Sequence, residues 1–246
     1  MPGHETAFQE LHERVQWCRG QQIVLKAEML SFLDGAYSVT SEVADGGTTT
    51  VLATGLKPVP RSISIHSGTI LNELRATLDG LACALAVMNG QGPEKVYFPI
   101  CADAKAFAQD GRKKIAKLCG EHRDLIERLQ PYVTGDNLLL GLHQADILRK
   151  HQRLMLASCA PAELGISEGV FEVFEMHEGA IPVGAAVPVV TYLSAIPPRF
   201  RIEFGVAFAE PAPFKGRQVL SILDRLCDRI ERIVCHFSPV TRPPSS

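Results

Sequence analysis

Leucines recur at alternating steps of three and four through residues 66–88, and this spacing keeps them on one face of an α-helix. The main row of apolar positions is Leu71, Leu74, Leu78, Leu81, Leu85 and Met88. A second row adds Ile70 and Ala84, which widens the apolar face. Because so wide a face has to be covered on several sides, the pattern predicts a central helix that ends at Asn89-Gly90.

Two charged residues, Arg75 and Asp79, interrupt this apolar helix four positions apart. At that spacing they form an ion pair on one side of the helix, worth a few tenths of a kcal/mol if it is exposed to solvent. If the pair is instead partly buried beside the leucine row, both charges need partners and hydrogen bonds. A buried pair would fix the helix register or line a site, and the pattern leaves both interpretations open.

Five further segments have the apolar spacing or the end signals of helices. These helices are predicted over residues 4–19, 102–107, 113–129, 137–157 and 216–237. Gly20 is expected to end the first, since Gly is a poor helix former that favours helix ends. Pro131 is expected to end the third, because the residue before a Pro avoids the helical conformation. Asp136 is expected to cap the fourth.

Stretches rich in β-branched residues predict strands on both sides of the helical segments. The predicted strands cover residues 23–33, 37–43, 48–56, 169–176, 186–193 and 200–208, with short extended pieces at 62–65 and 96–100. Asp34-Gly35 and Asp45-Gly46 are turn signals of the kind that joins hairpin strands. Residues 23–33 have a second interpretation, as a continuation of the first helix. The pattern does not decide whether the two β segments pair in one sheet or flank the helices separately.

Short connections between these elements predict one α+β domain over residues 1–237, a helical bundle of five or six helices with antiparallel β segments. Its helical centre covers about residues 66–157, and its β-rich parts cover 23–56 and 169–208. The Pro- and Ser-rich tail, 238–246, is expected to be disordered.

The composition is that of an ordinary globular protein. Of the 246 residues 46% are hydrophobic and 21% are charged, and the formal net charge is -2. No global basic excess marks the chain as a nucleic-acid-binding protein, although a local basic patch is compatible with this balance. No run of apolar residues is long enough to cross a membrane, and the polar N-terminal stretch does not resemble a signal peptide.

The seven cysteines form no CxxC pair, which indicates free thiols in a reducing compartment and argues against a zinc site. We therefore expect a cytoplasmic protein without a metal or other cofactor. Neither a Gly-rich phosphate loop nor a G-x-S-x-G motif is present, which lowers the expectation of a nucleoside-triphosphate hydrolase or an α/β-hydrolase.

Four segments in order resemble a widespread bacterial family without an established activity. They read LNELRATLDGLACAL, YFPI, LIERLQPY and RKHQRLML, where the family carries HNLRSALDHLA, FPI, LQPY and DKHR. The matching positions are Asn72, Leu74, Arg75, Leu78, Asp79, Leu81, Phe98, Pro99, Ile100, Gln130, Pro131, Tyr132, Lys150, His151 and Arg153. One departure matters for function, since Gly80 stands where the family has His after the Asp.

A looser resemblance is to HEPN-type domains, in which a bundle helix carries an Arg and a His separated by four to six residues. Many of these domains are metal-independent ribonucleases that act as dimers. The resemblance implies that the Arg stabilises phosphate charge and that the His transfers a proton. With Gly80 in place of His, His151 would have to supply the proton-transfer group from another helix. Arg229 and His236 on the last helix also have this spacing.

The basic run around His151 is the second candidate element of a site. Its usual interpretation is a solvated helix face, but three cations and a His can also hold a phosphate group. Facing it, Arg75 would add a guanidinium, and Asp79 would orient one of the cations. The candidate ligand-binding residues are Arg75, Asp79, Lys150, His151 and Arg153, and Arg75 and His151 are the catalytic candidates. A metal held by His143, Asp146 and His151 is a weaker alternative, and we expect none.

These residues lead to three hypotheses on function. The first is a non-catalytic protein that binds a partner or an anionic ligand, a nucleotide or a nucleic acid, through the residues just named. The second is a HEPN-like metal-independent ribonuclease or toxin-type nuclease, degenerate at Gly80, and a homodimer is the expected assembly in that case. The third is a structural subunit without a small ligand. A cleft shared by Arg75 and His151 would favour the first two.

Overall fold

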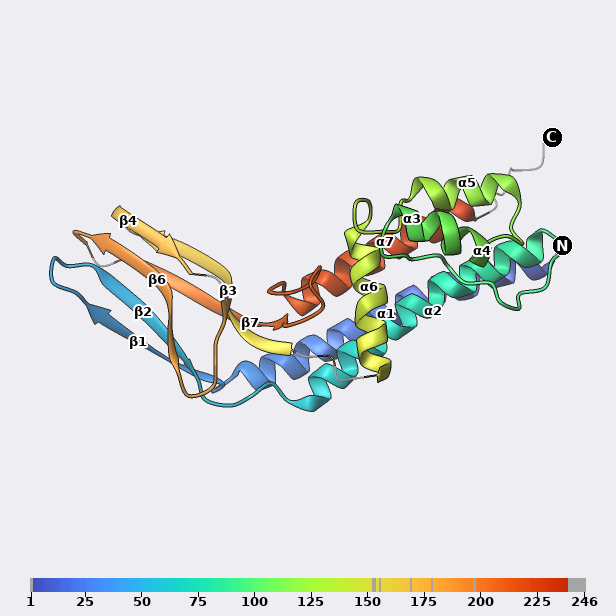
Figure 1. Cartoon of the computed structure of the whole chain (residues 1–246). Helices are drawn as coiled ribbons and strands as arrows, with labels where there is room; N and C mark the ends of the chain where they lie inside the picture. Colours follow the sequence, from blue (N-terminus) through green and yellow to red (C-terminus); the bar gives the residue numbers. More distant parts are fainter. Residues whose placement is uncertain are drawn as a thin grey trace, which may run out of the picture. The chain divides into compact units, whose positions relative to one another are not determined.

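The computed structural model describes residues 2–151, 154, 156–168, 170–177, 179–196 and 198–238. Over these residues the chain has an α+β fold, as predicted (Figure 1). The helices are α1 (Pro2–Leu33), α2 (Arg61–Met88), α3 (Ala104–Ala106), η1 (Phe107–Gly111), α4 (Arg112–Lys114), α5 (Gly120–Arg128), α6 (Asn137–His151) and α7 (Val219–Phe237). The strands are β1 (Tyr37–Val43), β2 (Thr49–Gly55), β3 (Leu156–Glu168), β4 (Phe171–Met176), β5 (Gly179–Ala180), β6 (Ala186–Ser194) and β7 (Arg199–Phe208). Because α3, η1 and α4 follow one another without a gap, the described residues contain six helical stretches.

The first helix continues through Gly20 instead of ending there, so the prediction of a helix end at this residue is wrong. A Gly inside a helix costs about 1 kcal/mol relative to Ala, which burial of apolar side chains further along the helix can offset. Leu25, Met29 and Phe32 supply that burial, since each is almost fully buried. The strand predicted over residues 23–33 is therefore wrong, and the alternative of a continued helix is confirmed.

Replacing Gly20 by Ala should raise the free energy of unfolding by about 0.5–1 kcal/mol, because Ala loses less backbone entropy in a helix. A Cβ at this position would meet no atom within 4 Å, so no clash opposes the gain. Urea denaturation of the full chain measures the difference. Gly90→Ala is the matched control: Gly90 has φ +71 just after α2, where Ala is strained, and the same change there should destabilise. A neutral or destabilising Gly20→Ala would contradict the prediction.

The central helix α2 carries its leucine row in the core, as predicted. The row is fully buried at Leu71, Leu74, Leu78, Leu81 and Leu85. The helix ends at the predicted place but begins earlier, so the extended piece expected at 62–65 is wrong. Ile63 is fully buried two turns before Ile70, and this burial continues the apolar face into the first helical turn.

Two of the other predicted helices differ at their ends. The continuous helix expected over 113–129 is interrupted, because Ile115 leaves the helical conformation and Cys119 has an extended backbone before α5. Gly120, a poor helix former, follows this break. Helix α6 begins where predicted, capped by Asp136, whose carboxylate accepts the N–H groups of residues 138 and 139. It ends at His151, before the predicted residue 157.

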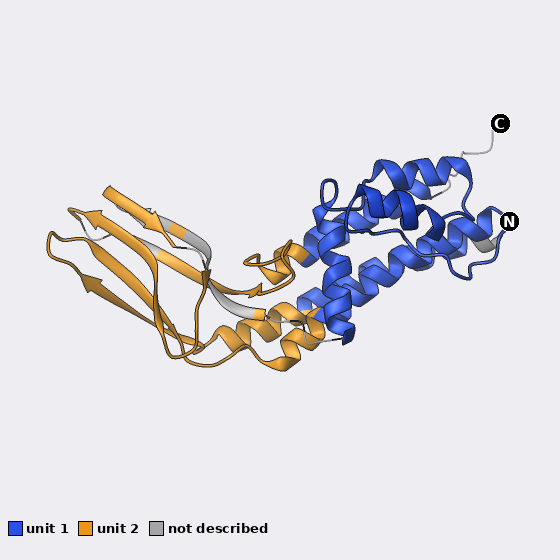
Figure 2. Cartoon of the chain, in the orientation of Figure 1, with its two compact units in different colours: residues 1–23, 68–152, 223–246 blue, residues 24–67, 153–222 orange. Residues whose placement is uncertain are grey.

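The described chain divides into two compact units (Figure 2). Unit 1 comprises residues 1–23, 68–152 and 223–246, and unit 2 comprises residues 24–67 and 153–222. Compactness does not measure whether a unit folds alone, so the expectation of one domain stays a prediction. The tail from residue 239 onward lies outside the described residues.

Unit 1 is helical, and charged side chains join its long helices. Arg14 on α1 pairs with Glu73 on α2 at 3.3 Å. Arg19, also on α1, pairs with Asp228 at 2.6 Å and Glu231 at 2.9 Å, both on α7. The apolar face predicted for the last helix is buried at Val219, Ile222, Leu223, Leu226, Ile230, Ile233 and Val234.

Unit 2 holds two antiparallel sheets, with strand orders β1-β2-β6-β4 and β5-β3-β7. Pairing of β2 with β6, for example Val51 opposite Val190, joins the two predicted β segments in one sheet and settles the question that the sequence left open. The core of this unit consists of Val51, Ala53, Ile181, Val189 and Val190. Ile202 and Phe204 of β7 pack against it, so the inner faces of the two sheets contact each other. Strand β3 was not predicted.

No helix among the described residues is both long and apolar enough to span a membrane. The cysteines whose side chains are described are all free thiols.

Candidate functional site

The charged pair of α2 is partly buried and holds the backbone of a neighbouring segment. Only 6% of Arg75 is exposed, and its Nη1 lies 2.8 Å from Oδ1 of Asp79. Nη2 of Arg75 donates to the carbonyl of Phe98 at 2.9 Å, and the N–H of Phe98 donates to Asp79 at 2.8 Å. Both backbone groups of Phe98 are thus bound by one helix, which fixes the segment that the sequence predicted as an extended piece. The buried interpretation of this pair is confirmed.

Asp79 shows what burial of this pair costs. Burial raises the pKa of its carboxyl above the ordinary value, although the Arg75 charge, the Phe98 N–H and the Lys150 charge all oppose the rise. The opposing influence of Lys150 also places this α6 side chain near the pair, as expected from the sequence. The partners of Asp79 therefore offset only part of the effect of burial on its carboxyl.

A second buried carboxylate, Asp146, links α2 to α6. Only 3% of Asp146 is exposed, and it accepts a hydrogen bond from Nδ2 of Asn72 at 2.9 Å. Its other oxygen lies 2.6 Å from Nζ of Lys150 one turn along α6. Asp146 therefore holds the Lys150 ammonium from one side, while about half of the Lys150 side chain stays exposed.

His143, one turn before Asp146, lies in the same cluster. Burial and, after it, the positive charges of Arg75, Lys114 and Lys150 together lower the pKa of its imidazole to about 4, against the opposing charge of Asp146. The ring is therefore neutral at pH 7. Positive charges from three helices, α2, α4 and α6, therefore act on one histidine.

Two buried nitrogens of this cluster lack a hydrogen-bond partner among the described residues. One is Nη1 of Arg75, which is ion-paired with the Asp79 carboxylate at 2.8 Å, and the other is Nδ1 of His143, which has no such ion pair. A buried polar group without a partner costs roughly 1–3 kcal/mol.

Lys114 adds a cation that is not neutralised. Its side chain is half-buried on α4, and its ammonium has no ion-pair or hydrogen-bond partner in the part of the chain that the structure describes. Its neighbours differ, since Arg112 pairs with Glu127 and Lys113 pairs with Asp110. An unpaired, half-buried ammonium beside a neutral histidine favours binding of a negative group.

We define the anion cluster as Arg75, Lys114, His143 and Lys150, with Asp79 and Asp146 holding two of its cations. The sequence identified Arg75, Asp79 and Lys150, and the structure brings these three together. No role was predicted for Lys114 from the sequence, and His143 was considered only as a metal ligand. His151 is exposed at the end of α6, and no contact between described residues joins it to Arg75, so its role stays a prediction. Arg153 lies outside the described residues.

The remaining sequence candidates have structural partners. Arg229 donates through Nε to Asp136 at 2.7 Å, and the same carboxylate caps α6. This pair ties α7 to the start of α6, while His236 is exposed. No three metal-binding side chains gather among the described residues.

Gly80, the position where the predicted resemblance would place a His, has a packing role. A Cβ at Gly80 would lie 3.0 Å from Cδ2 of Leu11, so α1 and α2 approach closely here. A larger side chain would require Leu11 to move.

Comparison with protein-family models, with curated proteins and with solved structures finds no match for this chain. The resemblance to the bacterial family and to HEPN-type domains therefore stays a prediction.

Proposed function

We propose that unit 1 binds a phosphate-bearing ligand, a nucleotide or a nucleic acid, through the anion cluster and without catalysis. The observation that carries this proposal is the buried Nδ1 of His143, which has no hydrogen-bond partner among the described residues and lies in the field of three cations. A phosphate group offers several acceptor oxygens and a negative charge, and it suits both features at once. Lys114 and Lys150 then contribute charge from either side.

The same geometry favours binding over the nuclease alternative. A general acid has to be protonated before it transfers its proton, and it works best with a pKa near the working pH. The His143 pKa of about 4 leaves almost no protonated imidazole at pH 7. The family resemblance would place a histidine at position 80, but this chain has Gly80 there, and it packs against Leu11. Neither position supplies the proton-transfer group of a HEPN-like ribonuclease.

Lys114→Gln should weaken phosphate binding by about tenfold, because one charge-assisted hydrogen bond is worth roughly 1.5–3 kcal/mol. Inorganic phosphate titrated into the full chain, followed through the imidazole resonances of His143 by NMR, measures the affinity. Lys113→Gln is the matched control, since the neighbouring ammonium is exposed and already pairs with Asp110 at 2.9 Å. It should leave the affinity within about twofold.

Equal losses for Lys113→Gln and Lys114→Gln, or no response of His143 to phosphate, would contradict the proposal. Titration with a mononucleotide and with a single-stranded oligonucleotide distinguishes the two ligand sources. Binding to a nucleic acid weakens steeply with salt in proportion to the number of phosphates contacted, whereas a mononucleotide gives a shallow slope. Incubation with RNA tests the alternative: cleavage by the wild-type chain that disappears in His151→Ala would establish a nuclease instead.

A further inference from the structure

Strand β1 forms one edge of its sheet, and no strand in the part of the chain that the structure describes pairs with its outer side (Figure 1). Six of its seven residues are exposed. Natural proteins usually place a Lys, a Pro or a bulge on such an edge, which prevents pairing with another chain. Strand β1 has none of these, and Glu42 is its one charged residue. Strand β4 at the opposite edge is less suited to pairing, since Glu172 and Glu175 stand within its six residues.

The backbone groups of every second β1 residue point away from β2. The carbonyl of Ala36, just before the strand, accepts from the N–H of Leu56 at 2.8 Å. The N–H of Ala44, just after it, donates to the carbonyl of Thr48 at 2.9 Å. Even-numbered residues therefore bond to β2, because successive residues of a strand direct their N–H and C=O groups to opposite sides. The outward groups include those of Val39, Ser41 and Val43.

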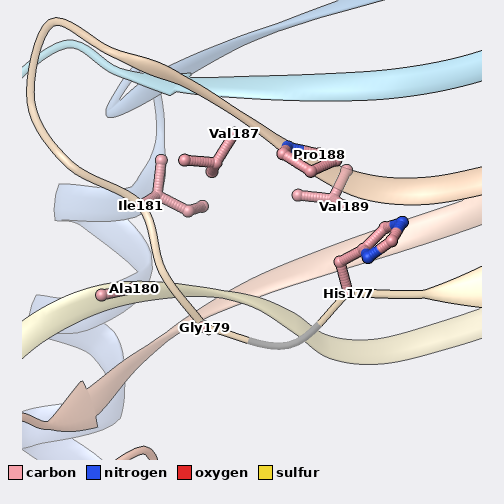
Figure 3. Close-up of a pocket in the computed structure, with 7 residues that line it drawn as sticks. All are labelled: His177, Gly179, Ala180, Ile181, Val187, Pro188 and Val189. Carbon is pink, nitrogen blue, oxygen red and sulfur yellow. The ribbon is translucent and has the colours of Figure 1, made fainter.

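The core-facing side of the sheet is open to solvent at β1. Val39 lies opposite Ala53 of β2, a fully buried core residue, so the two side chains share this side. Further along the sheet the same side is covered, and Figure 3 shows Ile181 facing Val187 of β6 beside a pocket. At β1, by contrast, 49% of Val39 and 70% of Val43 is exposed. Burial of these two valines would supply free energy for association.

We propose that two copies of the chain pair β1 with β1 in antiparallel order about a two-fold axis at Thr40. An axis perpendicular to the sheet keeps the core-facing sides of the two copies together. Val39 then lies opposite Ser41 of the second copy, and Tyr37 lies opposite Val43 of the second copy. The outward N–H and C=O groups of each such pair bond to each other. This dimer does not depend on the function proposed for unit 1.

The sequence of β1 suits this self-pairing in length, charge and side-chain type. Thr40 is the middle residue, so an axis there pairs the whole strand, and any shift of the axis shortens the overlap. On the outer face Glu42 lies opposite Ser38 of the second copy, so the two carboxylates do not face each other. On the core-facing side Tyr37 meets Val43, an aromatic and β-branched pair of the kind that stabilises antiparallel strands. These features favour a second copy as the partner.

Lysine at two positions of the outer face tests this register, since the same added charge should act in opposite directions. Thr40→Lys places two ammonium groups opposite each other at the axis and should weaken the dimer about threefold. Ser38→Lys places an ammonium opposite Glu42 of the second copy, twice in each dimer, and should tighten it about threefold. Both positions are exposed, so the fold of one chain tolerates either change.

Sedimentation equilibrium of the full chain over a range of concentrations measures the dissociation constant of the dimer. The mass of the wild-type chain should rise with concentration from that of one copy toward that of two. A chain that stays monomeric throughout, or equal effects of Thr40→Lys and Ser38→Lys, would overturn the proposal.

Ser41→Pro tests the hydrogen bonds across the dimer. It removes an outward N–H from each copy and should weaken the dimer at least about tenfold, while an edge strand tolerates Pro where its N–H faces solvent. Thr40→Pro is the matched control, because the N–H of Thr40 points toward β2, and this change should lower the free energy of unfolding in urea instead. A dimer that Ser41→Pro leaves intact forms through another surface and would contradict the proposal. The two Lys variants keep the test decisive if Ser41→Pro fails to fold.

Discussion

Arg75→Met is expected to lower the free energy of unfolding by about 3 kcal/mol, because removing one partner of a buried ion pair leaves the other charge uncompensated. Asp79 would lose the cation that opposes the effect of burial on its carboxyl. The carbonyl of Phe98 would also lose its donor. Met has a similar length without charge, so the change tests electrostatics and hydrogen bonding more than packing. Urea denaturation of the full chain measures the loss.

Arg14→Met is the control for this change, since Arg14 also pairs with a carboxylate of α2 but on the surface. Exposed pairs contribute about 0–1 kcal/mol, so this variant should remain close to wild type. Arg75→Met combined with Asp79→Asn should recover roughly 1 kcal/mol relative to Arg75→Met alone, because Asn still accepts from the Phe98 N–H without a buried charge. A loss for Arg75→Met no larger than that for Arg14→Met would show that the pair contributes little to stability.

The local periodicity of α2 was sufficient to predict its buried face, and the charged pair beside that face could be recognised as exceptional. What the pair binds could not be predicted, because Phe98 is brought to Arg75 by a loop and not by helical spacing. In the predicted family resemblance, Arg75 and Phe98 belong to two separate motifs, LNELRATLDGLACAL and YFPI. Their contact in the structure gives a physical reason for them to occur together.

The errors in the fold have a common cause, since tertiary packing overrode local preferences. Ile23 and Val24 are β-branched and suggested a strand, yet both are exposed on a helix whose burial is supplied by other positions. Strand β3 was missed for the opposite reason. It contains Pro161 and Gly165, which are depleted in strands, so its sequence lacks the expected pattern. Pairing with β7 stabilises it nonetheless.

Candidate site residues were predictable only where they were close in sequence to other charges. His151 attracted attention because Lys150 and Arg153 surround it in the chain. His143 has no such neighbours, and the cations that lower its pKa come from three different helices. Its spacing of three from Asp146 and seven from Lys150 places all three on one helix face, which is the one signal in the sequence that could have identified it.

The stability of the full chain should fall as the pH decreases from about 6.5 to about 4, in part because of His143. The folded-state pKa of about 4 lies below the unfolded value of about 6.5, so only the unfolded chain binds the proton in this interval. The contribution of His143 is complete above pH 6.5 and is lost as the pH approaches 4. Allowing for solvent screening of a half-buried ring, the loss amounts to roughly 2 kcal/mol.

Comparison of wild type with His143→Leu isolates this contribution, because other groups titrate in the same interval. Burial also lowers the pKa of His122, which adds a loss of the same sign, while the raised pKa of Asp79 acts in the opposite direction at the acidic end. Urea denaturation at pH 7, 5.5 and 4.5 should show a shallower loss for His143→Leu. Parallel slopes for wild type and His143→Leu would mean that the cations of the anion cluster do not act on His143, and the basis for placing a phosphate there would be lost.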